Sequence, residues 1–271
     1  MNAAGRQHAL PRPSATVVLV RAAAGDPEIL LVRRNARAAF GAAYVFPGGV
    51  LDTADRAARG RTSGAFRAHA ARCLGLGDEA LDYYSAAVRE LFEETGVLLA
   101  HDARGRWALH AATAATFRRE RQRLNDGDLC WSELLERHRL LLPCDRLHYI
   151  AHWITPLGLP RRFTTRFFAA ALPAGQEASH DGAELTDSRW STAAAALAAD
   201  RDGELDLPPP TRMTLQQLAG YGSVDALLRW AKQRQSGGVE ACLPAIVGAA
   251  GEEHVVMPGQ PDYPPHGGDE P

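Results

Sequence analysis

The sequence lacks the features of a membrane, secreted or nucleic-acid-binding protein. It has no apolar run near the length of about 20 residues that spans a bilayer, and residues 1–13 lack the apolar core of a signal peptide. Its four cysteines show no C-x-x-C spacing, so neither a zinc site nor a disulfide framework is indicated. The formal net charge is -2, whereas proteins that bind nucleic acid usually carry an excess of basic residues. We therefore expect a cytoplasmic protein with no membrane or nucleic-acid partner.

The composition is that of an ordinary globular protein, with 46% hydrophobic and 23% charged residues over 271 positions. We expect strands at residues 14–20, 28–33, 44–46, 97–100, 147–155, 163–171 and 185–190. We expect helices at residues 64–74, 81–95, 191–199, 211–219 and 223–233, and a pair of helices within 112–140, broken near 125–127. This mixture favours a layered α/β or α+β domain.

The chain also shows a change in composition near its end. We expect a flexible N-terminus over residues 1–13 and one domain over residues 14–235. Glycine and proline become frequent over residues 236–271, which is typical of an extended tail with little core of its own.

The most informative segment runs from Arg89 to Val97. Glu90, Glu93 and Glu94 stand at i, i+3 and i+4, so a helix projects all three carboxylates from one face. Like charges at this spacing are unfavourable by themselves, whereas a hard divalent cation favours clustered carboxylate oxygens. A solvated acidic helix face is the alternative interpretation.

The opposite side of this helix is apolar. Its stripe would dock the helix on a core and consists of Tyr84, Val88, Leu91 and Phe92. Gly96 follows where a left-handed C-terminal residue is expected. The sequence thus predicts a helix that is buried on one side and acidic on the other.

The run from Arg89 to Val97 resembles the second half of the Nudix box, in which an arginine, three glutamates and a glycine keep this spacing. Further upstream, Phe46-Pro47-Gly48-Gly49 resembles the first half of the box. Asp55 follows at the position where the family usually has Glu. Residues from 56 to about 81 then interrupt the box. The coenzyme A diphosphatase branch of the family carries an insertion in this place, so the chain resembles that branch.

This resemblance implies a Nudix α/β/α sandwich with a mixed β-sheet and helical insertions. It implies divalent-metal-dependent hydrolysis, with Mg²⁺ or Mn²⁺ as cofactor and a small-molecule nucleotide as substrate. Coenzyme A or acyl-CoA, split into 3′,5′-ADP and 4′-phosphopantetheine or its acyl form, is the expected substrate. Two alternatives stay open: a pyrophosphatase for ADP-ribose or NADH, and a non-catalytic Nudix-like regulatory module. The sequence also leaves open whether the chain forms a homodimer.

The resemblance assigns roles to the acidic residues. Glu90, Glu93 and Glu94 are expected to bind metal and to act in catalysis. Arg89 lies one turn before Glu93 and can orient its carboxylate. Glu184 precedes a strand that ends in tryptophan, a position from which many Nudix enzymes reach the metal as ligand or base. An ordinary loop carboxylate is the alternative for Glu184.

Six residues are expected to contact substrate: Gly48, Gly49, Arg34, Trp153, Arg162 and Phe163. The two glycines let the backbone approach a metal and a diphosphate closely. Trp153, Arg162 and Phe163 flank a Pro/Gly turn between two strands, where they would stack on a base and bind phosphate. Arg34 belongs to the run at residues 30–34, which resembles part of a separate coenzyme A signature. Strand core with exposed arginines is the alternative for each of them.

Three further features have no settled role. Asp52 and Asp55 would either bind a cation through water or cap the loop. His148 and His152 share one strand face and are expected to be structural. Residues 257–263 resemble a closing motif of the coenzyme A branch, whose purpose the sequence does not indicate.

Overall fold

Strand β1 (Arg12–Arg21) lies at the centre of the fold, because the side chains along most of its length are buried. Its run of alanine, valine and leucine is typical of a strand covered from both sides. It pairs antiparallel with β2 (Glu28–Arg34) and β4 (Gly48–Val50), and parallel with β6 (Phe163–Ala171). The computed structural model describes residues 9–34, 43–62, 64–179, 185–249 and 252–264.

The remaining strands complete a mixed eight-stranded sheet. Its order is β3-β2-β1-β6-β5-β8, with β4 beside β1 and β7 beside β2. These strands are β3 (Tyr44–Val45), β5 (His148–Ile154), β7 (Leu185–Thr192) and β8 (Ala241–Cys242). Only the β1–β6 and β5–β8 pairs are parallel among the described strands. The predicted mixed sheet is confirmed.

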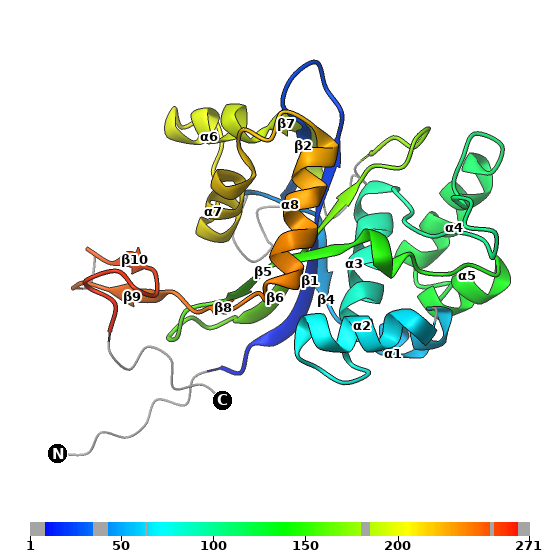
Figure 1. Ribbon diagram of the computed structural model, residues 1–271, viewed down its shortest axis with the longest axis horizontal. Helices are drawn as coiled ribbons and strands as arrows, with labels where there is room; N and C mark the ends of the chain where they lie inside the picture. Colours follow the sequence, from blue (N-terminus) through cyan, green and yellow to red (C-terminus); the bar gives the residue numbers. More distant parts are fainter. Residues whose placement is uncertain (1–8, 35–42, 63, 180–184, 250–251, 265–271) are drawn as a thin grey trace.

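Helices cover both faces of the sheet (Figure 1). They are α1 (Thr53–Ala57), η1 (Ala58–Arg61), α2 (Gly64–Leu74), α3 (Ala80–Thr95), α4 (Ala114–Asn125), α5 (Trp131–Arg137), η2 (Cys144–Arg146), α6 (Ala193–Arg201), α7 (Pro209–Leu218) and α8 (Val224–Ser236). Val17 and Leu19 of β1 belong to the core shared with α2 to α5, whereas Val18 and Val20 belong to the core shared with α6 to α8. This alternation follows from the two-residue period of a strand and gives the expected α/β/α sandwich.

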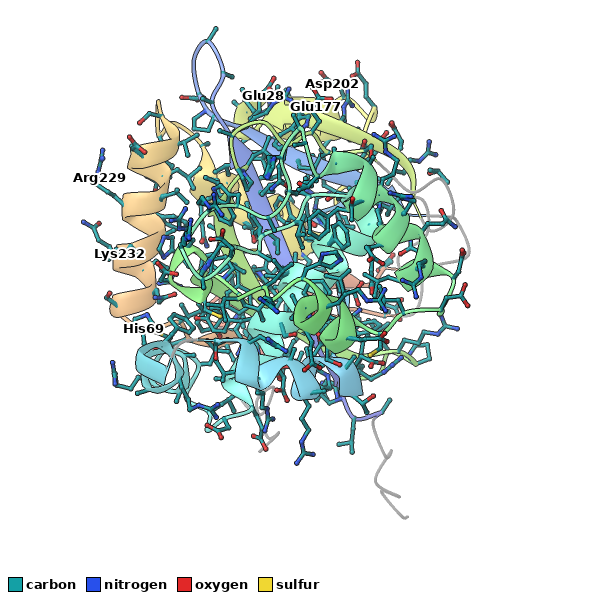
Figure 2. All side chains as sticks on the ribbon, turned by 90° about the vertical axis from the view of Figure 1, so that its right-hand side faces the viewer. Glu28, His69, Glu177, Asp202, Arg229 and Lys232 are labelled. Carbon is teal, nitrogen blue, oxygen red and sulfur yellow. The ribbon has the colours of Figure 1, made fainter. Side chains whose placement is uncertain are left out.

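Helix α8 illustrates how the outer layers are amphipathic. Its Leu227 and Ala231 are buried in the core beneath it. Arg229 and Lys232 point away from the sheet on the outer side of the same helix (Figure 2). No helix in the described part of the chain has the length and apolar content to cross a membrane.

The helices predicted at residues 64–74 and within residues 112–140 are confirmed. The insertion contains α2 as predicted and the short η1, and α1 lies at its start; the sequence did not indicate α1 or η1. The segment at 112–140 forms the predicted pair, α4 and α5, with the break after Asn125.

The strand expected at residues 97–100 is wrong: this segment is buried, but it is not part of a sheet. Its backbone hydrogen bonds go elsewhere. The side chain of Gln176 accepts from the Leu98 N–H at 2.9 Å and donates to the Leu98 carbonyl at 3.1 Å. An apolar run alone does not distinguish a buried strand from a buried segment that a side chain satisfies.

The tail after α8 contains more structure than its composition indicated. Strand β8 extends the sheet beside β5, and β9 (Ala245–Val247) and β10 (His254–Val256) form a separate hairpin. Leu243 and Val256 are buried. The tail therefore packs against the domain.

Candidate active site

Helix α3 is fixed on its inner side and at its end. The predicted apolar stripe is fully buried, and Gly96 ends the helix with a left-handed φ of 74°. Arg121, from α4, donates to the backbone carbonyls of Glu93 at 2.9 Å and Glu94 at 2.7 Å. A cation at the C-terminus of a helix is favourable because the carbonyl ends carry negative partial charge.

Arg89 connects the outer face of this helix to the loop before it. Its Nη1 donates to Glu90 and to Glu93, both at 2.9 Å, and its Nη2 donates to the Val50 carbonyl at 2.9 Å. The guanidinium also donates to the Asp55 carboxylate at 3.0 and 3.1 Å. Burial opposes its charge, but these carboxylates outweigh that effect and raise the pKa of Arg89. The predicted contact between Arg89 and Glu93 is present.

Asp52 and Asp55 were expected either to bind a cation through water or to cap the loop, and their contacts are those of caps. The carboxylate of Asp55 is fully buried and accepts from Ser85 at 3.0 Å and from the Asp52 N–H at 2.8 Å, besides Arg89. Asp52 in turn accepts from the Ala54 N–H, so the two aspartates form a capping box at the start of α1. Burial raises the pKa of Asp55, although Arg89 opposes the shift. Both aspartates act as caps here.

The two glycines bring the loop against the acidic face of α3. The N–H of Gly48 donates to Glu94 Oε2 at 2.9 Å. A Cβ at Gly49 would lie 2.4 Å from the Glu90 carboxylate, and one at Gly48 would lie 2.3 Å from the Ala15 carbonyl oxygen. No side chain fits at either position without displacing its neighbour, so the close approach depends on glycine.

The three glutamates fit a hard cation by the chemistry of their donors. They are carboxylates on one helix face, which suit Mg²⁺ or a similar ion, and the Glu90 carboxylate lies against the backbone of Gly49. Burial, with the charge of Glu90 adding to it, raises the pKa of Glu93 to about 7 against the opposing effect of Arg89. Within the described residues, no three His, Cys, Asp or Glu side chains converge on one metal-sized point. Arg89 donates to the carboxylates of Glu90 and Glu93, and the Gly48 N–H donates to that of Glu94.

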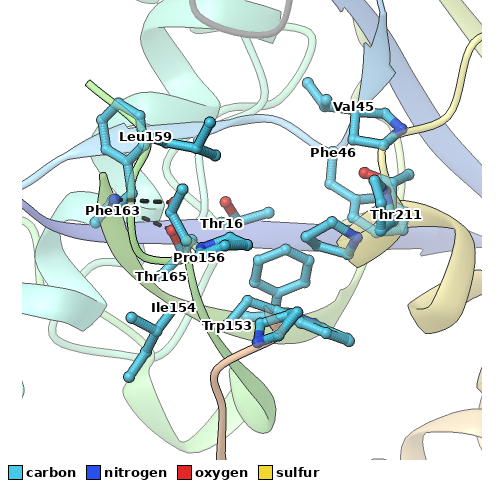
Figure 3. A pocket seen from close by; sticks show the side chains of 18 of the residues that line it. Thr16, Val45, Phe46, Trp153, Ile154, Pro156, Leu159, Phe163, Thr165 and Thr211 are labelled. Carbon is cyan, nitrogen blue, oxygen red and sulfur yellow. Dashed lines mark hydrogen bonds between the residues drawn. The ribbon is translucent and has the colours of Figure 1, made fainter. Parts of the chain in front are cut away.

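A cavity of about 260 Å³ opens beside the Gly48–Gly49 loop. Figure 3 shows Leu159 and Phe163 at one end of it and Val45 and Thr211 at the other. Trp153 and Phe163, both predicted to contact substrate, line its wall. The sequence did not indicate the contributions from Pro208–Pro210 or from the tail, because nothing local marks residues that reach a site from a distant part of the chain.

Arg162 lies close to this cavity in the chain, but it does not line it. The residue is almost fully buried and donates to the carbonyls of Thr155 and Pro156, both at 3.1 Å, and of Ala9 at 2.8 Å. It holds the β5–β6 turn, and this placement argues against the phosphate-binding role expected for it. Glu184 and the side chain of Arg34 lie outside the described residues.

The fold and this site define a Nudix hydrolase. The structure is similar to the crystal structure of a NUDIX hydrolase from Alicyclobacillus acidocaldarius, with a TM-score of 0.64 and 28% identity over 81% of this chain and 96% of that one. The family model described as the NUDT19 Nudix domain matches residues 65–218, and the chain belongs to this family. The matched residues include the acids of α3 but not the two glycines.

Two relatives align over most of the chain. The acyl-coenzyme A diphosphatase NUDT19 of Gallus gallus is 28% identical over 93% of this chain and 80% of its own length. The protein of the same name from Homo sapiens is 29% identical over 87% of this chain and 72% of its own length. Nudix hydrolases generally use divalent metal ions.

Proposed function

We propose that this Nudix hydrolase is a coenzyme A diphosphatase that accepts coenzyme A or acyl-CoA. It would release 3′,5′-ADP and 4′-phosphopantetheine or its acyl form, with Mg²⁺ or Mn²⁺ as cofactor. One observation carries the assignment of the site: Arg89 joins two glutamates of α3 to the loop of Gly48 and Gly49. The substrate class rests on the two NUDT19 relatives, which are named acyl-coenzyme A diphosphatases. In this proposal residues 14–235 are the catalytic domain.

The acidic residues supply the metal site in this proposal. Glu90, Glu93 and Glu94 would hold the divalent ions, with Glu184 as a further ligand or the base. When bound, such ions neutralise the diphosphate and lower the pKa of a bound water. Arg89 orients Glu90 and Glu93 through one nitrogen, so their carboxylates are positioned before any ligand arrives. The diphosphate would approach the backbone of Gly48 and Gly49, which line the cavity beside these acids.

The decisive experiment compares Glu93→Gln and Glu94→Gln with the wild-type protein. Each variant should lose at least about a hundredfold of kcat with Mg²⁺, a loss in the range seen when a group that stabilises the transition state is removed. Glu136→Gln, a change at an exposed residue of α5, is the matched control and should keep full activity. Near-normal turnover by either α3 variant would refute the assignment.

Product analysis by chromatography decides the substrate. The panel is coenzyme A, acyl-CoA, ADP-ribose, NADH and nucleoside triphosphates, each with Mg²⁺ or Mn²⁺. We expect the highest kcat/KM for a coenzyme A substrate. Turnover of ADP-ribose or NADH alone would move the protein to the other pyrophosphatase class. Turnover of none would favour a regulatory module, although all three acids of the box are present in this chain.

A further inference from the structure

The cavity beside the catalytic loop is apolar and uncharged along its described lining. Its walls come from the Gly48–Gly49 loop, the β5–β6 turn, Pro208–Pro210 and the tail hairpin. No lysine, arginine, aspartate or glutamate is among the described lining residues. A nucleotide phosphate would call for cationic or N–H donors in such a wall, so this cavity suits an uncharged part of a substrate.

The tail hairpin places two exposed apolar side chains at the rim of the cavity. Ile246 of β9 and Val255 of β10 pair directly across the hairpin, and both line the cavity. They are 38% and 41% exposed, and in the described part of the chain only Leu10 is a further exposed large hydrophobic residue. Exposed apolar side chains beside a pocket indicate a surface that a ligand covers.

Trp153 supplies a hydrogen-bond donor in the same wall. The residue is 6% exposed, and its indole N–H finds no acceptor among the described residues. A buried tryptophan N–H usually has an acceptor. The Trp153 side chain lines the cavity, and a small shift of this buried N–H toward the cavity would let an amide or thioester carbonyl of a ligand accept from it. The cavity therefore fits a chain that is mostly apolar and carries a few carbonyl acceptors.

The tail is held at the cavity by its own contacts. Cys242 of β8 pairs with Trp153 of β5, and the chain continues through Pro244 into the hairpin. The Tyr263 hydroxyl donates to the Leu243 carbonyl at 2.7 Å, which returns the end of the tail to the start of the hairpin. Residues 257–263, which resemble a closing motif, thus fasten the outer wall of the cavity.

We infer that this cavity binds the pantetheine half of the substrate and that Ile246 and Val255 contact its acyl chain. The inference rests on the proposed function. The pantetheine arm consists of a dimethyl-substituted carbon chain with two amides and no charge beyond its phosphate. The other half of coenzyme A carries adenine and a 3′-phosphate, for which the described lining offers no cation. The diphosphate between the halves would then lie at Gly48 and Gly49, against the acids of α3.

The double variant Ile246→Ser/Val255→Ser tests the acyl contact. With dodecanoyl-CoA we expect KM to rise about tenfold with kcat unchanged, because the lost contacts are made equally in the ground and transition states. With coenzyme A, which has no acyl chain, KM should change less than twofold. Leu10→Ser removes an even more exposed apolar side chain, which does not line the cavity, and should change neither value. An equal effect on both substrates, or none, would overturn the acyl contact.

Trp153→Phe tests the pantetheine assignment without requiring turnover. The change keeps an aromatic ring and removes the N–H, and a thermal melt verifies that the variant folds. Calorimetric titration of wild type and variant with 4′-phosphopantetheine and with 3′,5′-ADP separates the two halves of the substrate. We expect binding of 4′-phosphopantetheine to weaken severalfold and binding of 3′,5′-ADP to stay the same. Weaker binding of 3′,5′-ADP, or no binding of 4′-phosphopantetheine by the wild type, would overturn the inference.

The same measurements distinguish the two proposals. If no coenzyme A substrate is hydrolysed but 4′-phosphopantetheine binds in a Trp153-dependent way, the proposed activity fails and the cavity assignment stands. If coenzyme A and dodecanoyl-CoA are hydrolysed with identical changes in every variant, the activity stands and the cavity assignment fails.

Discussion

Arg89 and Asp55 form a buried ion pair, with two hydrogen bonds of 3.0 and 3.1 Å, across the interruption of the Nudix box. Asp55 lies at the start of the inserted helices, whereas Arg89 lies on the helix that carries the acids. The pair therefore holds the two separated halves of the box together.

Asp55→Asn should destabilise the protein by about 3 kcal/mol, because removing one partner of a buried ion pair leaves uncompensated charge. Urea unfolding followed by circular dichroism measures this. Asp52→Ala, which removes only the capping side chain, should cost about 1 kcal/mol and is the comparison. Equal losses for the two variants would show that Asp55 matters only as a cap.

Gly49→Ala should lower kcat/KM at least about tenfold, because its Cβ would lie 2.4 Å from the Glu90 carboxylate and displace it. The thermal midpoint should change little, since that carboxylate is partly exposed and can move. Gly60→Ala is the matched control, as nothing lies within 4 Å of a Cβ at that position. Full activity in Gly49→Ala would mean that the close approach has no catalytic role.

Arg162→Gln should destabilise the protein by about 2 kcal/mol, because it leaves buried carbonyls without their donor. Its KM for coenzyme A should stay within about twofold of wild type, as the guanidinium does not face the cavity. Steady-state kinetics and urea unfolding measure both effects. A large rise in KM with unchanged stability would restore the phosphate-binding role predicted from the sequence.

His152 should make the protein less stable as pH falls. Burial, with Arg166 adding to it, lowers the pKa of His152 to about 4, whereas an unfolded histidine has a pKa of about 6.5. The unfolded state therefore binds more protons between these values, and the stability contributed by neutral His152 is lost as pH falls from about 6.5 to about 4. His152→Gln should flatten this part of the stability profile in urea titrations. An unchanged profile would show that another group causes the acid sensitivity.

Divalent ions should stabilise the wild-type protein more than Glu93→Gln. A ligand that binds only the folded state raises the free energy of unfolding by RT ln(1 + L/Kd), where L is the free ligand concentration. We expect Mg²⁺ to raise the thermal midpoint of wild type and a chelator to abolish hydrolysis until Mg²⁺ or Mn²⁺ is restored. Equal shifts in the two proteins would place the ion away from Glu93.

The sequence predicted well wherever a local pattern determines the structure. The stripe from Tyr84 to Phe92 and the glycine at position 96 defined α3, because a helix with one buried face has a regular period. The run at 97–100 was misread, since its hydrogen bonds depend on Gln176, far away in the chain. The surroundings of Arg162 could not be predicted for a similar reason: only the folded chain brings carbonyls from two segments around one guanidinium.

Strand β8 has one consequence beyond the active site. It covers the edge of β5, which would otherwise present free backbone groups to the strands of other molecules. A chain cut after α8 would lose this cover and the hairpin wall together, exposing a strand edge next to an apolar hollow. Such a truncated protein should aggregate during expression even though its acidic helix is intact.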